Sequence, residues 1–133
     1  MKAIYLAGPY SAPSDYLRAC NIQAAWQRAA FLWSIPGVYC VCPHLNTMNM
    51  DGVVTLDGAT DREKFIQADL DLLARCDAIY MLRNWEGSKG AAGEHTYAVN
   101  LKKRIFYEGK DWSTAIRNWA EAEDRAKWEL KSG

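Results

Sequence analysis

The feature that most constrains the fold of this chain is an alternation of short apolar segments with longer helical ones. Several of the apolar segments end at turn-forming residues, as at Gly8-Pro9 and at Pro43. Strands that alternate with helices pair in parallel, because each helix carries the chain back across the sheet. The pattern predicts strands at 2–7, 38–42, 76–82 and 104–107, and helices at 15–34, 61–75, 90–101 and 113–130.

This order of elements predicts an α/β fold, with a single doubly wound domain of Rossmann-like or flavodoxin-like type over residues 1–133. We expect a central parallel sheet of four to five strands, covered by helices on both faces. The apolar stripe of the first helix includes Leu17, Ala25 and Phe31, and small residues in the 90–101 helix predict tight packing on the sheet. Residues 44–60 lack periodicity and predict a long loop.

The composition argues against several classes of partner. Sixteen basic residues balance sixteen acidic ones, so no overall charge draws the chain to a nucleic acid polymer or a membrane surface. No apolar run approaches the roughly 20 residues that span a bilayer, and the apolar N-terminal segment is too short for a signal peptide. The four cysteines lack metal-ligand spacing. We therefore expect reduced thiols, a cytoplasmic location, and no metal or other cofactor.

Three predicted loops follow strands and are expected to meet at one edge of the sheet. They are Gly8-Pro9-Tyr10-Ser11, Pro43-His44-Leu45-Asn46, and the stretch from Trp85 to Glu94. Ligands of α/β proteins bind outside the carboxyl ends of the strands, and the N-terminus of a helix favours anions. The loops therefore predict a pocket for a small anionic or polar ligand.

Glu94 is the leading catalytic candidate, because we expect it in the first turn of a helix that opens with small residues. A carboxylate there acts as a nucleophile or general base, or it only complements the helix dipole. Ser88 binds a phosphate or is an ordinary turn serine. His44 is an acid–base group or a lone structural histidine, and Trp85 stacks on a base or forms a pocket wall. The spacing alone leaves these alternatives open.

Three segments, in this order and spacing, are similar to segments of the nucleoside 2-deoxyribosyltransferase superfamily. They are Ile4-Tyr5-Leu6-Ala7-Gly8-Pro9-Tyr10, the stretch from Asp69 to Ile79, and the loop from Trp85 to Glu94. The branch that the chain most resembles is a group of small phage and bacterial proteins, related to nucleoside 5′-monophosphate N-glycosidases.

The resemblance implies roles for individual residues. Glu94 takes the position of the glutamate that attacks C1′ of a nucleoside or nucleotide and forms a covalent glycosyl intermediate. Tyr5 matches the tyrosine whose hydroxyl lies near that glutamate. Asp69 matches the aspartate that orients the base or transfers a proton to it, and Ser88 matches a phosphate-binding serine. Together with the loops, this makes the expected substrate-binding residues Gly8, Pro9, Tyr10, His44, Trp85, Ser88, Gly90 and Asn118.

The resemblance leads us to expect hydrolysis of the N-glycosidic bond of a (deoxy)ribonucleoside 5′-monophosphate. A deoxyribosyltransferase that moves the sugar between bases is the first alternative, and a non-catalytic nucleotide-binding module is the second. The family also implies a homodimer or higher oligomer, in which a C-terminal residue completes a neighbour's site. Asn118 is the first candidate for that role and Ser113 the second. The expected partner is thus a small nucleotide or nucleoside.

Overall fold

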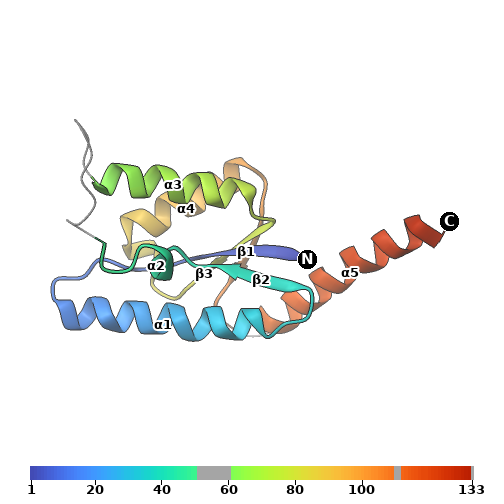
Figure 1. Ribbon diagram of the computed structural model, residues 1–133, viewed down its shortest axis with the longest axis horizontal. Coiled ribbons are helices and arrows are strands. Elements are labelled where there is room, and N and C mark those ends of the chain that lie inside the picture. Colours follow the sequence, from blue (N-terminus) through green and yellow to red (C-terminus); the bar gives the residue numbers. More distant parts are fainter. Residues whose placement is uncertain (51–60, 110–111, 133) are drawn as a thin grey trace.

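A computed structural model gives the arrangement of helices and strands (Figure 1). It describes the backbone of residues 1–50, 61–109 and 112–132, and the side chains of residues 1–50, 62–109 and 112–122. The elements in chain order are β1 (Lys2–Ala7), α1 (Asp15–Trp33), β2 (Val38–Val41), α2 (Pro43–Asn46), α3 (Asp61–Arg75), β3 (Ala78–Met81), the 3₁₀ turn η1 (Trp85–Gly87), α4 (Lys89–Asn100), β4 (Arg104–Tyr107) and α5 (Trp112–Ser132).

The sheet of the described residues is all parallel and has the strand order β2-β1-β3-β4. Register pairs Tyr5 of β1 with Val41 on one side and with Ile79 on the other. The chain moves outward from β1 to β2, then crosses back to β3 on the other side of β1. The predicted doubly wound parallel sheet is confirmed, with four strands. Its switch point lies between β1 and β3, where α/β proteins bind ligands.

Helices cover both faces of the sheet, α1 on one side and α3 with α4 on the other (Figure 1). Side chains alternate along each strand, so Ile4 and Leu6 face the core under α1 and α5, while Tyr5 and Ala7 face the core under α3 and α4. All the residues of β3 are buried, which is typical of a parallel strand covered on both sides. The side chain of Tyr5 therefore points toward the helices that follow β2 and β3.

Local signals explain where the elements begin and end. The Ser14 hydroxyl accepts a hydrogen bond from the backbone N–H of Leu17 and so caps α1. Asp77 closes the turn before β3, because its carboxylate accepts from the N–H of Ala3 at 2.8 Å and its own N–H donates to the Ala3 carbonyl. These two bonds tie the residue just before β3 to β1.

One sequence prediction about packing is wrong and another is confirmed. Leu17 and Phe31 are not core residues of α1, since their exposed fractions are 47% and 41%. The small residues predicted to pack α4 on the sheet include Ala91 and Ala98, which are buried there. A Cβ atom added at Gly90 or Gly93 would meet nothing within 4 Å, so these two glycines take no part in that packing.

The long loop predicted after β2 begins with a short helix, α2. Pro43 occupies its first turn, where a fixed φ and a missing N–H cost nothing. Residues 51–60 of the predicted loop lie outside the described residues. Cys20, Cys40, Cys42 and Cys76 are free thiols, and no helix in the described part of the chain is long and apolar enough to cross a membrane.

Candidate active site

Three residues of the predicted site come together under α3 and α4. Tyr5 lies in β1, Asp69 in α3 and Glu94 in the second turn of α4. Tyr5 is completely buried. Its hydroxyl makes no hydrogen bond of ordinary geometry with any described residue. It does face the Glu94 carboxyl, with which it makes a weaker hydrogen-bonding contact. A buried hydroxyl without a full partner is costly, and a bound ligand would relieve that cost.

The electrostatics of this cluster favour neutral carboxyl groups. Burial raises the pKa of Glu94 to about 7, opposed by the hydrogen-bonding hydroxyl of Tyr5 and helped by the charge of Asp69. Burial also raises the pKa of Asp69 to about 6. Burial, followed by the charges of both carboxylates, raises the pKa of Tyr5, so its hydroxyl stays protonated and able to donate. The cluster therefore holds two carboxyl groups that exchange protons near neutrality.

The turn after β1 needs a glycine. A Cβ at Gly8 would lie 2.7 Å from the Cβ and the Cδ1 of Leu82, at the end of β3. Only a residue without a side chain lets the two strand ends approach this closely. Gly8 thus fixes the geometry at the switch point of the sheet.

His44 ties the loop after β1 to α2. Its ring is buried, and its Nε2 lies 2.8 Å from the carbonyl oxygen of Pro9, to which it donates. The ring also meets Tyr10 edge-on, with the centroids 5.4 Å apart. Burial lowers the pKa of His44. This neutral histidine therefore joins two of the predicted loops and uses one ring nitrogen to do so.

Ser88 is the N-cap of α4. Its Oγ accepts a hydrogen bond from the N–H of Ala91 at 3.3 Å, which leaves the hydroxyl hydrogen free to donate. The added Cβ atoms of Gly87, Gly90 and Gly93 would all stand in open space. The N-terminal end of α4 thus offers a hydroxyl that can still donate, the positive end of a helix dipole and room for close approach.

Trp85 precedes this helix and is half-buried. Its ring stacks on His95 of α4, with centroids 4.2 Å apart and planes inclined by 29°. His95 in turn lies 2.8 Å from the hydroxyl of Tyr107 in β4. One face of the indole is therefore occupied, and stacking of a base on Trp85 is limited to its remaining surface.

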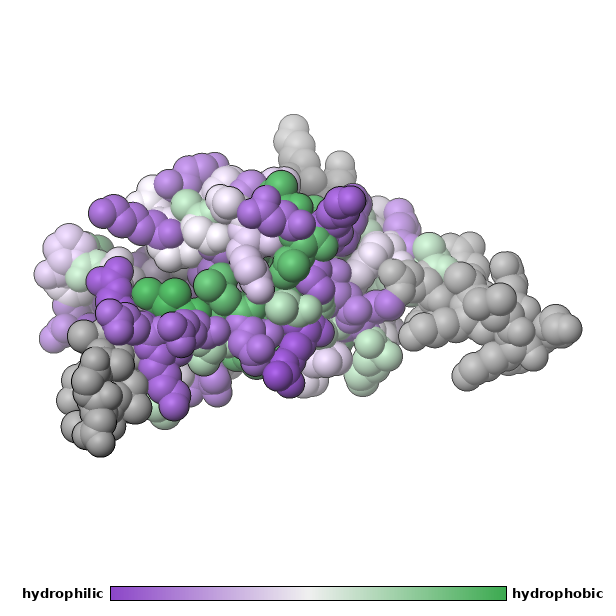
Figure 2. All heavy atoms as spheres, turned by 90° about the horizontal axis from the view of Figure 1, so that it is seen from above, coloured by the Kyte–Doolittle hydropathy of each residue, from purple (hydrophilic) through white to green (hydrophobic). Residues whose placement is uncertain are grey.

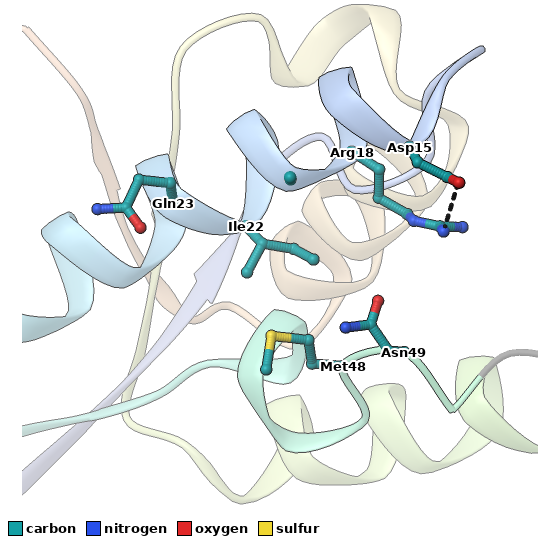
Figure 3. Close-up of a pocket in the computed structure, with 7 residues that line it drawn as sticks. Asp15, Arg18, Ile22, Gln23, Met48 and Asn49 are labelled. Carbon is teal, nitrogen blue, oxygen red and sulfur yellow. Dashed lines mark hydrogen bonds and ion pairs between the residues drawn. The ribbon is translucent and has the colours of Figure 1, made fainter.

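Two grooves lie elsewhere in the described structure. One, of about 370 Å³, lies between α1 and the segment that follows α2, where Arg18 pairs with Asp15 opposite Met48 and Asn49 (Figure 3). The other, of about 380 Å³, is lined by residues that include Arg28 and Glu108. Neither contains the carboxyl cluster. We place the candidate site at the cluster, because among the described residues only there do two carboxyl groups with raised pKa values meet a buried, incompletely bonded hydroxyl.

Asn118 lies apart from this cluster in its own chain. It is an exposed residue of α5, a helix that packs through Ile116 and Ala120 on the opposite core, under the α1 face. Ser113 lies in the first turn of the same helix. Neither residue is brought to Glu94 within one chain.

Sequence reasoning missed His95, Tyr107 and Glu108, which hold the loop before α4. Glu108 accepts hydrogen bonds from Arg83 and from Arg28. No motif marks these residues, although His95 directly follows Glu94, Tyr107 ends a predicted strand and Glu108 follows it. Among the described residues, no group of three or more His, Cys, Asp or Glu side chains is arranged to hold a metal ion.

Comparison with known proteins assigns the chain to a family. The family model called domain of unknown function (DUF4406) matches residues 2–107. The chain belongs to this family. DUF4406 lies within the nucleoside 2-deoxyribosyltransferase superfamily, so the resemblance seen in the sequence is confirmed. No curated protein sequence matches the chain.

Two solved structures are similar to this DUF4406 protein. A 2-deoxyribosyltransferase from Bacillus psychrosaccharolyticus is 20% identical, with a TM-score of 0.54 over 79% of this chain and 70% of its own. A 2-deoxyribosyltransferase from Leishmania mexicana is 26% identical, with a TM-score of 0.56 over 80% of this chain and 63% of its own. The present chain thus spans less than two thirds of the Leishmania protein. At 20% identity, its similarity to the Bacillus protein is a similarity of fold.

Proposed function

We propose that this DUF4406 protein hydrolyses the N-glycosidic bond of a (deoxy)ribonucleoside 5′-monophosphate. The observation that carries the proposal is the meeting of Tyr5, Asp69 and Glu94 from three separate elements in one partly buried cluster. Two carboxyl groups that titrate near neutrality suit a reaction in which one acts as nucleophile and the other as acid.

In the proposed reaction, ionised Glu94 attacks C1′ of the sugar. The C1′–N bond breaks, its electron pair leaves with the base, and the carboxylic acid form of Asp69 supplies a proton to that base. Tyr5 donates a hydrogen bond to Glu94 and orients its oxygens. A water molecule then attacks C1′ of the glycosyl ester, gives its proton to Asp69, and releases Glu94 with the sugar 5-phosphate.

Ser88 is the basis for proposing a monophosphate rather than a free nucleoside. Its hydroxyl hydrogen has no acceptor among the described residues, and it stands at the N-terminal end of α4, near Gly87 and Gly90, where an added Cβ would meet nothing within 4 Å. A dianionic phosphate is favoured by a hydroxyl donor and the helix dipole, whereas a carboxylate at this position would repel it.

Transfer of the sugar to a second base is the alternative. It is favoured by the two similar solved structures, both described as 2-deoxyribosyltransferases. The first chemical step is the same in both reactions, and they differ in whether water or a base resolves the intermediate.

A panel assay separates these functions. The purified protein is incubated with nucleosides and nucleoside monophosphates, with and without a second free base, and the products are resolved by chromatography. Base released from monophosphates alone supports hydrolysis, and product formed only with an acceptor base supports transfer. Binding without turnover would leave a nucleotide-binding module and contradict both reactions.

Replacement of Glu94 tests the nucleophile. We expect Glu94→Gln to lower kcat by about 10³-fold or more with the fold retained. The kcat/KM of the wild type should follow a bell-shaped pH profile with its maximum between the two pKa values of about 6 and about 7, because Glu94 must be ionised and Asp69 protonated. Ser88→Asp tests the phosphate contact, since it should weaken use of monophosphates more than use of nucleosides. Unchanged monophosphate kinetics in Ser88→Asp would contradict the phosphate assignment.

A further inference from the structure

We propose that Glu108, the residue directly after β4, is a positioning residue for the loop that brings Ser88 and α4 to the candidate site. This inference rests on the proposed function only for its kinetic consequence. Its structural part, that Glu108 holds the loop from Arg83 to Ser88 in place, stands on contacts within the chain.

Three hydrogen bonds hold Glu108 in place. Its backbone N–H donates to the carbonyl of Met81, the last residue of β3, at 3.0 Å. One carboxylate oxygen accepts from the backbone N–H of Arg83 at 2.8 Å. The other accepts from the guanidinium of Arg28 in α1 at 2.7 Å. The carboxylate thus joins α1 to the first residues after β3.

The loop that Glu108 holds is short and conformationally constrained. Asn84 follows Arg83 directly and has a φ of 66°, in the left-handed region that only a few residues tolerate. The 3₁₀ turn η1 comes next, and the N–H of Ser88 donates to the Trp85 carbonyl at 3.0 Å to close it. A displacement of Arg83 would therefore also displace Ser88.

Tyr107, the last residue of β4, supports the same loop at its middle. The hydroxyl of Tyr107 lies 2.8 Å from Nε2 of His95, and His95 stacks on Trp85. The end of β4 consequently holds the loop at its start through Glu108 and at its centre through Tyr107. Ser88 and the start of α4 are positioned from β4, on which no candidate catalytic residue lies.

The negative charge of Glu108 matters to this arrangement. Only 16% of its side chain is exposed, and only 24% of that of Arg28, whose guanidinium lies 4.2 Å from the centre of the Trp112 ring. Burial raises the pKa of Glu108, but the bond from the Arg83 N–H and the two arginines outweigh it, so the pKa stays below its ordinary value. Glu108 is therefore ionised at neutral pH and pairs with a partly desolvated arginine.

The test compares Glu108→Ala with Glu108→Gln in the full chain. Alanine removes both carboxylate contacts, whereas glutamine keeps an oxygen that can accept from the Arg83 N–H. We expect Glu108→Ala to speed amide hydrogen exchange at residues 83–88 by about tenfold or more, and to raise KM for the monophosphate by a similar factor with a smaller effect on kcat. Glu108→Gln should keep both the exchange rate at residues 83–88 and KM close to their wild-type values.

A matched control is Asp71→Asn, which breaks the exposed Asp71–Arg75 ion pair of α3. The proposal is overturned if exchange at residues 83–88 is unchanged in Glu108→Ala, or if Asp71→Asn changes it equally. A fall in thermal stability without a change in KM or in exchange at the loop would assign Glu108 a structural role only. If the wild type turns over no nucleotide, the proposed function fails, but the exchange experiment still tests the positioning.

Discussion

Glu94 and Asp69 are ionisable groups in a place that favours their neutral forms. Burial is the main cause for both, and the charge of Asp69 adds to the effect on Glu94. A carboxyl group whose pKa is higher in the folded than in the unfolded state destabilises the fold once it ionises. The candidate site should therefore cost stability at neutral pH, as sites built for catalysis often do.

Ionisation of Glu94 should lower the free energy of unfolding. The ordinary pKa of Glu94 is 4.5 and its folded pKa is about 7, so between these values the native state binds more protons than the unfolded state. Its contribution to the free energy of unfolding is thus present below pH 4.5 and is lost as pH rises through 7. Glu94→Gln should unfold at pH 8 with a free energy about 1–3 kcal/mol above that of the wild type, and close to it at pH 4.5.

Urea denaturation at both pH values measures this difference. Glu121→Gln, at an exposed position of α5, is the control and should behave like the wild type at each pH. An equal effect of Glu94→Gln at the two pH values would mean that ionisation of Glu94 does not penalise the fold.

The second prediction concerns glycines. A Cβ at Gly8 would strike Leu82 at 2.7 Å, so Gly8→Ala should lower the free energy of unfolding by about 1–3 kcal/mol. Gly93 lies inside α4 with open space around it, so Gly93→Ala should raise that free energy by about 0.5–1 kcal/mol. Thermal denaturation of both variants tests the contrast, and a stable Gly8→Ala would mean that the two strand ends can separate without cost.

The position of Glu94 at the start of a helix made it a catalytic candidate, but left open the ordinary explanation of a glutamate that complements the helix dipole. Sequence similarity added Tyr5 and Asp69 and favoured the catalytic role of Glu94, because each lies in a segment that resembles the superfamily. His95 and Glu108 were not predicted, because their importance depends on contacts between β4 and the loop before α4. Such contacts join residues far apart in the sequence and leave no local pattern.

At the scale of elements, the alternation of strands and helices was predictable from the sequence. The bounds of β1, α3 and β4 agree with the prediction. The apolar face of α1 was predicted only in part, because Ala25 and Ala29 are buried as expected whereas Phe31 is exposed. Size and hydrophobicity point to the aromatic side chains, whereas close approach of helix to sheet selects the small ones.

The third prediction concerns the start of α4. Ser88→Ala removes the side chain that accepts from the Ala91 N–H, so it should lower the free energy of unfolding by about 1 kcal/mol. Ser88→Asp keeps a capping oxygen and adds a charge that suits the helix dipole, so it should unfold close to the wild type. Chemical denaturation distinguishes them. Equal losses in both variants would show that Ser88→Asp damages the helix, and its kinetics could then not be read as phosphate repulsion.

At the scale of the whole molecule, the two faces differ in what they carry. The face with α3 and α4, seen from above in Figure 2, shows an apolar band between hydrophilic side chains. Exposed hydrophobic residues of these helices include Ile66 and Val99. Apolar surface of this kind suits contact with another protein surface. The helix α5, with Asn118, packs on the other core and runs out beyond the sheet (Figure 1).

This separation makes the proposed oligomer testable. If Asn118 completes a site, it must do so in a neighbouring copy, because its own α5 lies across the sheet from Glu94. Glu94→Gln and Asn118→Ala should then each be inactive alone. In a dimer with two-fold symmetry, a mixed pair forms one site that has both wild-type residues. Half of the dimers are mixed after random exchange of subunits, so about a quarter of the wild-type activity should return.

The measurement is activity after the two variants are unfolded and refolded together, with each variant refolded alone as the control. Sedimentation equilibrium of the same samples establishes that dimers form. Recovery of about a quarter of the activity would assign Asn118 to the neighbour's site. Dimers without recovery would remove Asn118 from the catalytic site, and Ser113→Ala in the same mixing experiment would then test the other residue of α5. A monomer that is fully active would contradict a shared site altogether, because every group needed for turnover would then lie in one chain.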